Sequence, residues 1–277
     1  MRKEPGNEEA TGLYSMINVL REQVEEVHDL FNWNNFEPAI EALGGVLEHI
    51  PWDPTLRELR ADCYLGLGNI IHAISDLRSV AKLTTDNTAV YFKLASLHYQ
   101  LGEAEESLNE IRECLKLDPE HRDCYPMYKK VKKVSKFLVG AKEAREGKDW
   151  ESCVSNAQKA LKNEPKVNRT SIKKLGAIKV IFFQVESVQF HAYDKLCQCQ
   201  MMTGDTGGSK KSCTEAIRID DQPRLYCERA KAYLAADMFD EAISDYRAAL
   251  ERDEGFSRAK KGMAKAQKFQ KQVETCE

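Results

Sequence analysis

A 34-residue repeat is the feature that most constrains this chain. Small residues stand at Ala39, Ala73 and Ser107, so each follows the previous one by 34 positions. Gly68 and Gly102 each precede a small residue by five positions, where a chain reversal is expected. A period of this length is typical of stacked pairs of helices. An unrelated helical bundle would not keep the same spacing over three units, so we predict an all-α solenoid.

The physics of one hairpin explains why small residues recur. Two short amphipathic helices cross closely only where each carries a small side chain, as Ala95 and Ser107 do in residues 88–121. Larger residues such as Tyr91 and Ile111 then fill the space around the crossing. One hairpin cannot bury its apolar face alone, so hairpins stack. The pattern resembles the tetratricopeptide repeat and predicts a superhelix (α-solenoid) of about six helical hairpins with one irregular insert.

The repeat spacing divides the chain into segments. The period lengthens to 46 between Ser107 and Cys153, which indicates a long first helix in the fourth repeat. In residues 166–189, β-branched and aromatic residues stand where a polar turn is expected. We interpret this stretch as an inserted loop, from a translated intron or an error in the gene model, rather than as a functional element. The expected segments are a helical lead-in (1–19), three repeats (20–121), a long linking helix with the fourth repeat (122–165), the insert (166–189), two further repeats (190–256) and a lysine-rich capping helix (257–277).

Composition and motifs argue against several classes of function. A net charge of −3 does not suit nucleic-acid binding, and the longest apolar run, 175–185, contains a lysine and is too short to span a bilayer. The six histidines are scattered, with no H-E-x-x-H or C-x-x-C pattern. The segment 204–212 resembles a phosphate-binding loop, but Ser209 stands where the motif needs glycine, so a turn is favoured. We therefore predict a protein that is not an enzyme and needs no cofactor or metal.

The inner surface formed by the first helix of each hairpin is the candidate binding surface. Arrays that capture the C-terminal carboxylate of a chaperone need a Lys/Asn pair in one repeat and Lys/Arg in the third. Val24 with His28, and Glu58 with Asp62, do not supply that pair. We therefore expect an apolar and aromatic groove suited to exposed hydrophobic segments of a client protein. The alternative is that several of these side chains pack against neighbouring helices. The candidates are Val24, Phe31, Leu59, Leu65, Phe92 and Tyr99, with His28, Lys93 and Ser96 beside them.

Nine cysteines raise the question of disulfide bonds. Cys114 and Cys124 flank a tight turn, and Cys197 and Cys213 occupy facing positions of one hairpin. Antiparallel helices would bring the Cα atoms of both pairs within the roughly 4.4–6.8 Å that a disulfide needs. Buried reduced cysteine is the alternative, because cysteine is also a common small apolar residue. The cysteines without an obvious partner are Cys63, Cys153, Cys199, Cys227 and Cys276.

Several segments resemble one known family. LRELRADC (56–63), DNTAVYFKLASLHYQLGE (86–103), ESLNEIRECLKLDPEHRDC (106–124) and MFDEAISDYRAAL (238–250) are similar to the DnaJ homolog subfamily C member three family. These are tetratricopeptide co-chaperones of the endoplasmic reticulum, also called inhibitors of the interferon-induced protein kinase. The likeness covers about 7–165 and 190–272, whereas 166–189 has no counterpart. The resemblance implies the disulfides Cys114–Cys124 and Cys197–Cys213.

The resemblance also implies a function. Members of the family bind misfolded clients in the lumen of the endoplasmic reticulum, deliver them to the lumenal Hsp70 chaperone and restrain kinases of translation initiation factor 2α. Delivery to Hsp70 depends on a J domain with a His-Pro-Asp motif that this sequence does not contain. We therefore expect a fragment without the signal, the first repeats and the J domain. Asn168 begins a glycosylation sequon within the expected insert.

A generic cytosolic tetratricopeptide adaptor with fixed peptide partners is the alternative to the co-chaperone. The two hypotheses differ in redox state, because a cytosolic adaptor should keep its thiols reduced.

Overall fold

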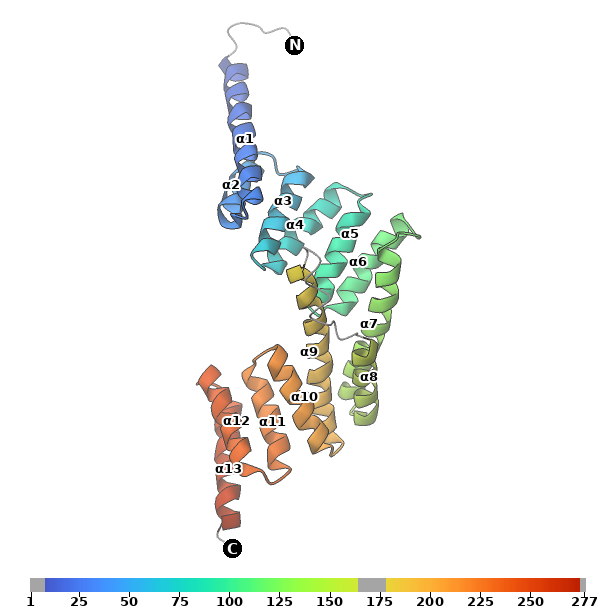
Figure 1. Ribbon diagram of the computed structural model, residues 1–277, viewed down its shortest axis with the longest axis vertical. Coiled ribbons are helices and arrows are strands. Elements are labelled where there is room, and N and C mark those ends of the chain that lie inside the picture. The colour runs from blue at the N-terminus through green and yellow to red at the C-terminus, as the bar shows by residue number, and fades with distance from the viewer. Residues whose placement is uncertain (1–7, 164–177, 275–277) are drawn as a thin grey trace.

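The computed structural model describes residues 8–163 and 178–274, and within these ranges it contains thirteen α-helices and no strand. Twelve helices form six antiparallel hairpins that stack side by side along an elongated molecule (Figure 1). The predicted all-α tetratricopeptide solenoid is therefore confirmed. The hairpins are α1 (Glu8–Asn32) with α2 (Phe36–His49), α3 (Pro54–Gly66) with α4 (Ile70–Leu83), α5 (Thr88–Gln100) with α6 (Ala104–Leu117), α7 (Cys124–Glu146) with α8 (Trp150–Asn163), α9 (Ile178–Met202) with α10 (Thr206–Ile219) and α11 (Pro223–Leu234) with α12 (Phe239–Arg252), and α13 (Ser257–Glu274) follows them.

Each hairpin turns through one residue in the left-handed backbone conformation. Glycine adopts a positive φ without a steric penalty, which explains why Gly68 and Gly102 recur 34 residues apart. A backbone amide that follows the turn also donates a hydrogen bond to the first helix; for example, Asn69 N donates to Tyr64 O at 2.8 Å. The residues with positive φ at these turns are Asn34, Gly68, Gly102, Lys148, Gly204 and Asp237.

Side-chain caps set the start of several helices. Asp53 Oδ1 accepts hydrogen bonds from Thr55 N at 2.8 Å and Leu56 N at 3.2 Å, which satisfies two free amides at the start of α3. Asp205 does the same for α10, where its Oδ1 accepts from Gly208 N at 2.8 Å. Residues 204–212 therefore form a hairpin turn and the first part of α10, as favoured above, and an aspartate occupies the place where a phosphate loop would bind its anion.

The small residues of the repeat lie at the helix crossings. Ala61, Ala73, Ala95 and Ser107 are all fully buried. The Ser107 hydroxyl donates to the carbonyl oxygen of Ala95 at 2.7 Å across its hairpin, so the helices meet there almost backbone to backbone. The same contact recurs in the fifth hairpin, where Ser209 Oγ donates to Cys197 O at 2.7 Å. The prediction that a small residue allows each close crossing therefore describes the regular and the irregular hairpins alike.

The expected boundaries change at two places. The lead-in 1–19 is not a separate element in its described part, because α1 runs without a break from Glu8 into the first hairpin. The end of the insert 166–189 is corrected, because residues 178–189 belong to α9; residues 164–177 and Asn168 lie outside the described residues. Tertiary contact explains the second change, since Val188 is fully buried against α5 and α7, which overrides its low helix propensity.

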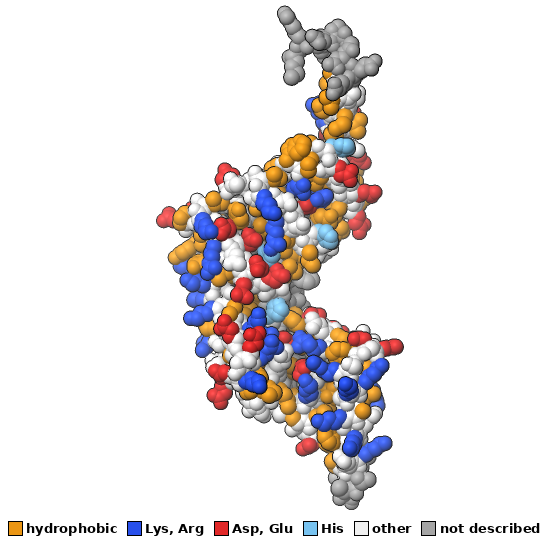
Figure 2. Space-filling view, turned by 180° about the vertical axis from the view of Figure 1, so that it is seen from behind, with side chains coloured by type: hydrophobic (Ala, Val, Ile, Leu, Met, Phe, Trp, Pro, Cys, Tyr) orange, Lys and Arg blue, Asp and Glu red, His pale blue; other side chains and the backbone are white. Residues whose placement is uncertain are grey.

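α9 lies at the centre of the molecule, between the first four hairpins and the last helices (Figure 1). It packs against α8 and α10, its neighbours in the stack, and also against α5, α7 and α11 (Figure 1). Its 25 residues would be long enough to cross a bilayer, but none of the described helices is apolar enough over such a length. α9 instead packs inside the solenoid, in contact with hairpins that precede it and hairpins that follow it. The molecule is hollowed on one face, between these two groups of hairpins (Figure 2).

Candidate binding surface and disulfide-bonded helices

The predicted groove residues lie on the first helices of three hairpins. Val24 and Phe31 are on α1, Leu59 and Leu65 on α3, and Phe92 and Tyr99 on α5. All except Tyr99 are half-buried. Val24, Phe31 and Leu59 pack against one apolar cluster that spans α1, α2 and α3, so much of their surface already contacts neighbouring helices. Their remaining exposed area is what a client could contact.

Tyr99 does not line an open surface. Its side chain is 2% exposed and packs against Val131 and Val134 of α7 and Val188 of α9. Lys130 Nζ lies 5.0 Å from the centre of the ring. The expectation that Tyr99 contacts a client is corrected for this reason: α9, which begins within the expected insert, packs against α5 and buries Tyr99.

The surface between α3 and α5 is charged as well as apolar. Lys93 forms an ion pair with Asp62 across the two helices. Beside it, Asn87 Nδ2 donates to Glu58 Oε1 at 3.2 Å. The expected groove is therefore mixed in character, because Leu59 and Phe92 each follow or precede a residue of a polar pair, Glu58 and Lys93.

An exposed apolar segment lies at the N-terminal end of α1, which sequence reasoning missed. α1 has 25 residues and α2 only 14, so the first turns of α1 project beyond their partner (Figure 1). Several hydrophobic side chains, coloured orange, are visible on this extension in the space-filling view (Figure 2). The sequence pattern that could have revealed this segment is the apolar spacing of Leu20 and Val24, which continues toward the N-terminus. The exposed fractions are Leu13 55%, Tyr14 63%, Met16 43%, Ile17 54% and Val19 53%.

Both predicted cysteine pairs are brought together at disulfide distance. Cys114 at the end of α6 and Cys124 at the start of α7 have Cα atoms 6.5 Å apart. Cys197 of α9 and Cys213 of α10 have Cα atoms 4.8 Å apart. These links join consecutive helices across short turns.

A further disulfide, Cys153–Cys199, joins α8 to α9, although neither residue had an expected partner. The repeat register could have predicted it. The two cysteines are 46 positions apart. Ser209 follows Cys153 by 56 positions instead of 34, so the irregular region adds 22, and without these 22 the separation is 24, the same as from Ala39 to Cys63. Ala39 and Cys63 lie in one buried cluster, which agrees with this register.

Two other cysteines within the described residues are reduced and buried. Burial raises the pKa of the Cys63 thiol to about 11, and burial raises that of Cys227 equally, so both stay protonated and unreactive at neutral pH. Cys276 lies outside the described residues.

An open pocket of about 340 Å³, lined by apolar and charged residues, lies between the α5–α6 turn, α7 and α9. Its lining includes His191 and Lys195, and burial lowers the pKa of both. Asp194, next to Lys195, accepts hydrogen bonds from Arg224 and Gln198, each at 2.8 Å. The hydrogen bond from Arg224 thereby ties α9 to α11.

Comparisons with known proteins agree with this architecture. The tetratricopeptide repeat model matches residues 88–121 and 223–256. The crystal structure of the P58(IPK) TPR domain superposes with a TM-score of 0.76 at 32% identity, covering 99% of this chain and 71% of that chain.

Curated relatives carry one recurring name. DnaJ homolog subfamily C member 3 of Bos taurus is 35% identical over 245 residues, which is 88% of this chain and 45% of the relative. The Gallus gallus protein is 32% identical over 277 residues, or 98% of this chain and 51% of the relative. The chain thus spans about half the length of the curated relatives it matches.

Proposed function

The chain belongs to the DnaJ homolog subfamily C member 3 family, and we propose that it is a non-catalytic scaffold that binds unfolded polypeptide segments. Family membership supports the broad role, a tetratricopeptide co-chaperone scaffold. The finer role rests on the exposed apolar end of α1. Folded proteins bury such side chains, whereas unfolded clients expose them, so a contact between apolar segments selects unfolded chains.

The α1 extension is shaped for this contact. Leu13 and Ile17 are each more than half exposed, and they continue the stripe that includes the half-buried Leu20 and Val24. A client segment bound along this stripe would bury apolar area on both partners, at about 25 cal/mol per Å². The half-buried groove candidates Phe31, Leu59, Leu65 and Phe92 extend the surface toward the inner side of the array.

Binding to a permanently unfolded protein tests the proposal. The probe is fluorescently labelled α-lactalbumin, reduced and carboxymethylated, and the comparison probe is the native calcium-bound form. We expect anisotropy to report binding of the unfolded probe only. The double variant Leu13→Ser/Ile17→Ser should weaken that binding by about tenfold or more, because two apolar contacts are lost.

The matched control is Trp52→Ser/Ile71→Ser, which removes two other exposed apolar side chains, 66% and 71% exposed, that are not part of α1. This control should bind the unfolded probe like the wild type. Equal affinity for native and unfolded probe, or equal loss in both double variants, would contradict the assignment of the surface to α1.

We place this scaffold in the lumen of the endoplasmic reticulum, and the disulfide geometry supports that location. The cytosolic adaptor predicts reduced thiols instead. A non-reducing peptide map of protein made in a secretory compartment separates the two. Linked peptides at Cys114–Cys124 and Cys197–Cys213 favour the lumen, and free thiols at all four positions in folded protein favour the adaptor.

Restraint of translation initiation factor 2α kinases is a further part of the proposal and rests on the family alone. If it uses the same surface, adding the chain should slow phosphorylation of the factor by the kinase, and Leu13→Ser/Ile17→Ser should restore the rate. The lumenal Hsp70 is a partner only through a J domain, so this chain alone should leave its ATPase rate unchanged.

A further inference from the structure

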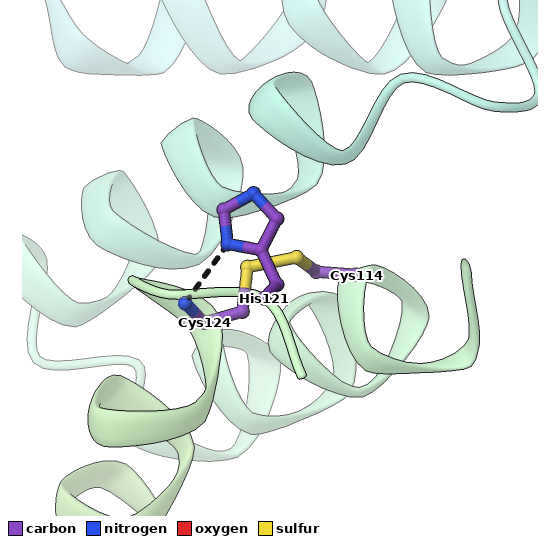
Figure 3. Close-up of side chains that lie close together, drawn as sticks. All are labelled: Cys114, His121 and Cys124. Atoms are coloured by element: carbon purple, nitrogen blue, oxygen red, sulfur yellow. Dashed lines mark hydrogen bonds between the residues drawn. A yellow bond between two sulfur atoms is a disulfide. The ribbon is translucent and has the colours of Figure 1, made fainter. Parts of the chain in front are cut away.

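Three potential metal ligands meet between α6 and α7. Cys114 lies in the last turn of α6, Cys124 is the first residue of α7, and His121 lies in the connection between them. One ligand atom from each falls within 4.8 Å of the other two. Figure 3 shows the imidazole of His121 beside the disulfide that joins the two sulfur atoms. Sequence reasoning saw no metal site here because it looked for C-x-x-C and H-E-x-x-H, whereas the pattern is C-x6-H-x2-C.

We propose that this cluster binds one Zn²⁺ ion when the Cys114–Cys124 disulfide is reduced. Zinc prefers thiolate and imidazole ligands in a tetrahedral arrangement, at about 2.3 Å from sulfur and 2.0–2.1 Å from nitrogen. The three ligand atoms lie close enough for one ion to reach all of them after small side-chain rotations. A water molecule completes the four ligands. This inference is independent of the proposed client binding.

The hydrogen bonds of His121 select the tautomer that metal binding needs. His121 Nδ1 accepts from the backbone amides of Asp123 and Cys124, both at 3.3 Å. An accepting nitrogen carries no proton, so the neutral ring is protonated at Nε2. The Nδ1 lone pair therefore points toward the start of α7, where Cys124 lies (Figure 3). A metal ion replaces two long hydrogen bonds with one coordination bond.

The electrostatics of the site favour two thiolates and a dication. The N-terminal end of α7, a helix of 23 residues, stabilises negative charge at Cys124. Both cysteines are fully buried, where a lone charge would be costly. Zn²⁺ with two thiolates and a neutral imidazole has no net charge, so the complex avoids that cost. His121 is half-buried and gives the ion a path from solvent.

Metal and disulfide exclude each other, so the site responds to redox conditions. An oxidant such as oxidised glutathione converts the zinc form to the disulfide form. The two zinc-bound thiolates lose two electrons and form the Cys114–Cys124 bond. The glutathione disulfide takes up these electrons and two protons to give two glutathione thiols, and Zn²⁺ is released.

The Cys197–Cys213 pair provides an internal contrast. It also joins two consecutive helices, yet no third potential ligand clusters with it within the described ranges. Reducing this pair should create no comparable zinc site. The position of His121 is therefore what distinguishes the two pairs.

Metal titration of the full chain tests the proposal. Protein reduced with a phosphine and freed of metal is titrated with Co²⁺, which reports thiolate ligation by a charge-transfer band and tetrahedral geometry by its visible bands. We expect wild-type protein to bind one more equivalent of Co²⁺, displaceable by Zn²⁺, than the Cys114→Ser/Cys124→Ser variant. Protein with the disulfide intact should lack this equivalent.

His121→Asn keeps the local fold while removing the ligand, because an asparagine side chain can accept the same backbone hydrogen bonds. We expect it to weaken zinc binding by about 100-fold or more, beyond the loss of an outer-shell partner. Cys197→Ser/Cys213→Ser should keep the wild-type affinity. The proposal is overturned if the reduced wild type binds no extra equivalent, or if His121→Asn binds zinc as tightly as wild type, with circular dichroism confirming that each variant is folded.

Discussion

The regular hairpin α3–α4 and the irregular hairpin α9–α10 join their two helices by different bonds at the same sequence separation. In α3–α4, Arg60 donates two hydrogen bonds of 2.7 Å to Asp76, 16 residues away. In α9–α10, Cys197 and Cys213 are joined by a disulfide, also 16 residues apart. The hairpin α11–α12 repeats the first solution, with Arg229 and Asp245. The two links lie at adjacent positions of the repeat, because the register that matches Cys199 to Cys63 places Cys197 and Cys213 opposite Ala61 and Leu77.

The disulfides found in the described residues all lie between 114 and 213, where the 34-residue period is lost. In the regular repeats, the corresponding positions are held together by apolar packing alone. Cys199 of α9 faces Cys153 of α8, whereas its counterpart Cys63 of α3 shares a buried cluster with Ala39 of α2. The comparison indicates that a covalent link, Cys153–Cys199, secures α8 to α9, the two helices that the insert separates.

Removing the Cys153–Cys199 disulfide should have the largest effect. The bond closes a loop of 46 residues, and loop entropy predicts a loss of about 4 kcal/mol in the double variant Cys153→Ala/Cys199→Ala. Hydrogen exchange should localise the loss to α8 and α9, which matters because solenoids do not unfold in a single step. The control is Cys114→Ala/Cys124→Ala, whose loop of 10 residues predicts a loss of about 3 kcal/mol. Faster exchange spread evenly over all hairpins would contradict this localisation.

Moving the same link into the regular repeats is the converse experiment. Ala39→Cys should form a disulfide with Cys63 under oxidising conditions, because the two positions correspond to Cys153 and Cys199. The closed loop of about 24 residues predicts a gain of about 3 kcal/mol, reduced by any strain. Urea unfolding with and without reductant measures the gain. The control is Ala73→Cys, which is also fully buried. The same spacing of 24 pairs Ala73 with Leu97 of α5, so this variant should leave Cys63 reduced.

Breaking the ion pair should cost less than breaking the disulfides. Asp76→Asn leaves the Arg60 guanidinium next to a neutral amide, and we expect a loss of about 2 kcal/mol because a charge-assisted pair is replaced. The same hydrogen bond with Asp76 raises the pKa of Arg60, so arginine stays charged at any usable pH. Asp245→Asn should give a similar loss in α11–α12, measured by urea unfolding. If reductant weakened the Asp76→Asn variant more than wild type, the ion pair and the disulfides would not be independent.

Local periodicity was enough to predict most of this fold. The 34-residue spacing predicts the hairpins, the glycine turns at Gly68 and Gly102 and the small residues at the crossings, because each depends on residues close in the chain. It could not predict that Val188 covers Tyr99, since that contact joins α9 to α5 across the region where the period is lost. The Cys153–Cys199 pair was not predicted for the same reason, because the 34-residue period is lost between the two cysteines. The cluster around His121 was missed because its ligands belong to two helices and their connection.

The smallest expected effect concerns the hairpin turns, and it compares the two regions directly. Gly68 in the regular repeats and Lys148 between α7 and α8 have φ values of 77° and 61°, and both are exposed. A left-handed conformation costs a residue with a Cβ atom about 1 kcal/mol relative to glycine. Lys148→Gly should therefore stabilise the protein by about 1 kcal/mol, and Gly68→Lys should destabilise it equally. A Cβ at Gly68 would meet no atom within 4 Å, so the second change tests backbone conformation without a clash. The sites are far apart, so the double exchange should leave the free energy of unfolding close to wild type. A net loss of about 1 kcal/mol in the double variant would mean that Lys148 makes a compensating contact in its turn.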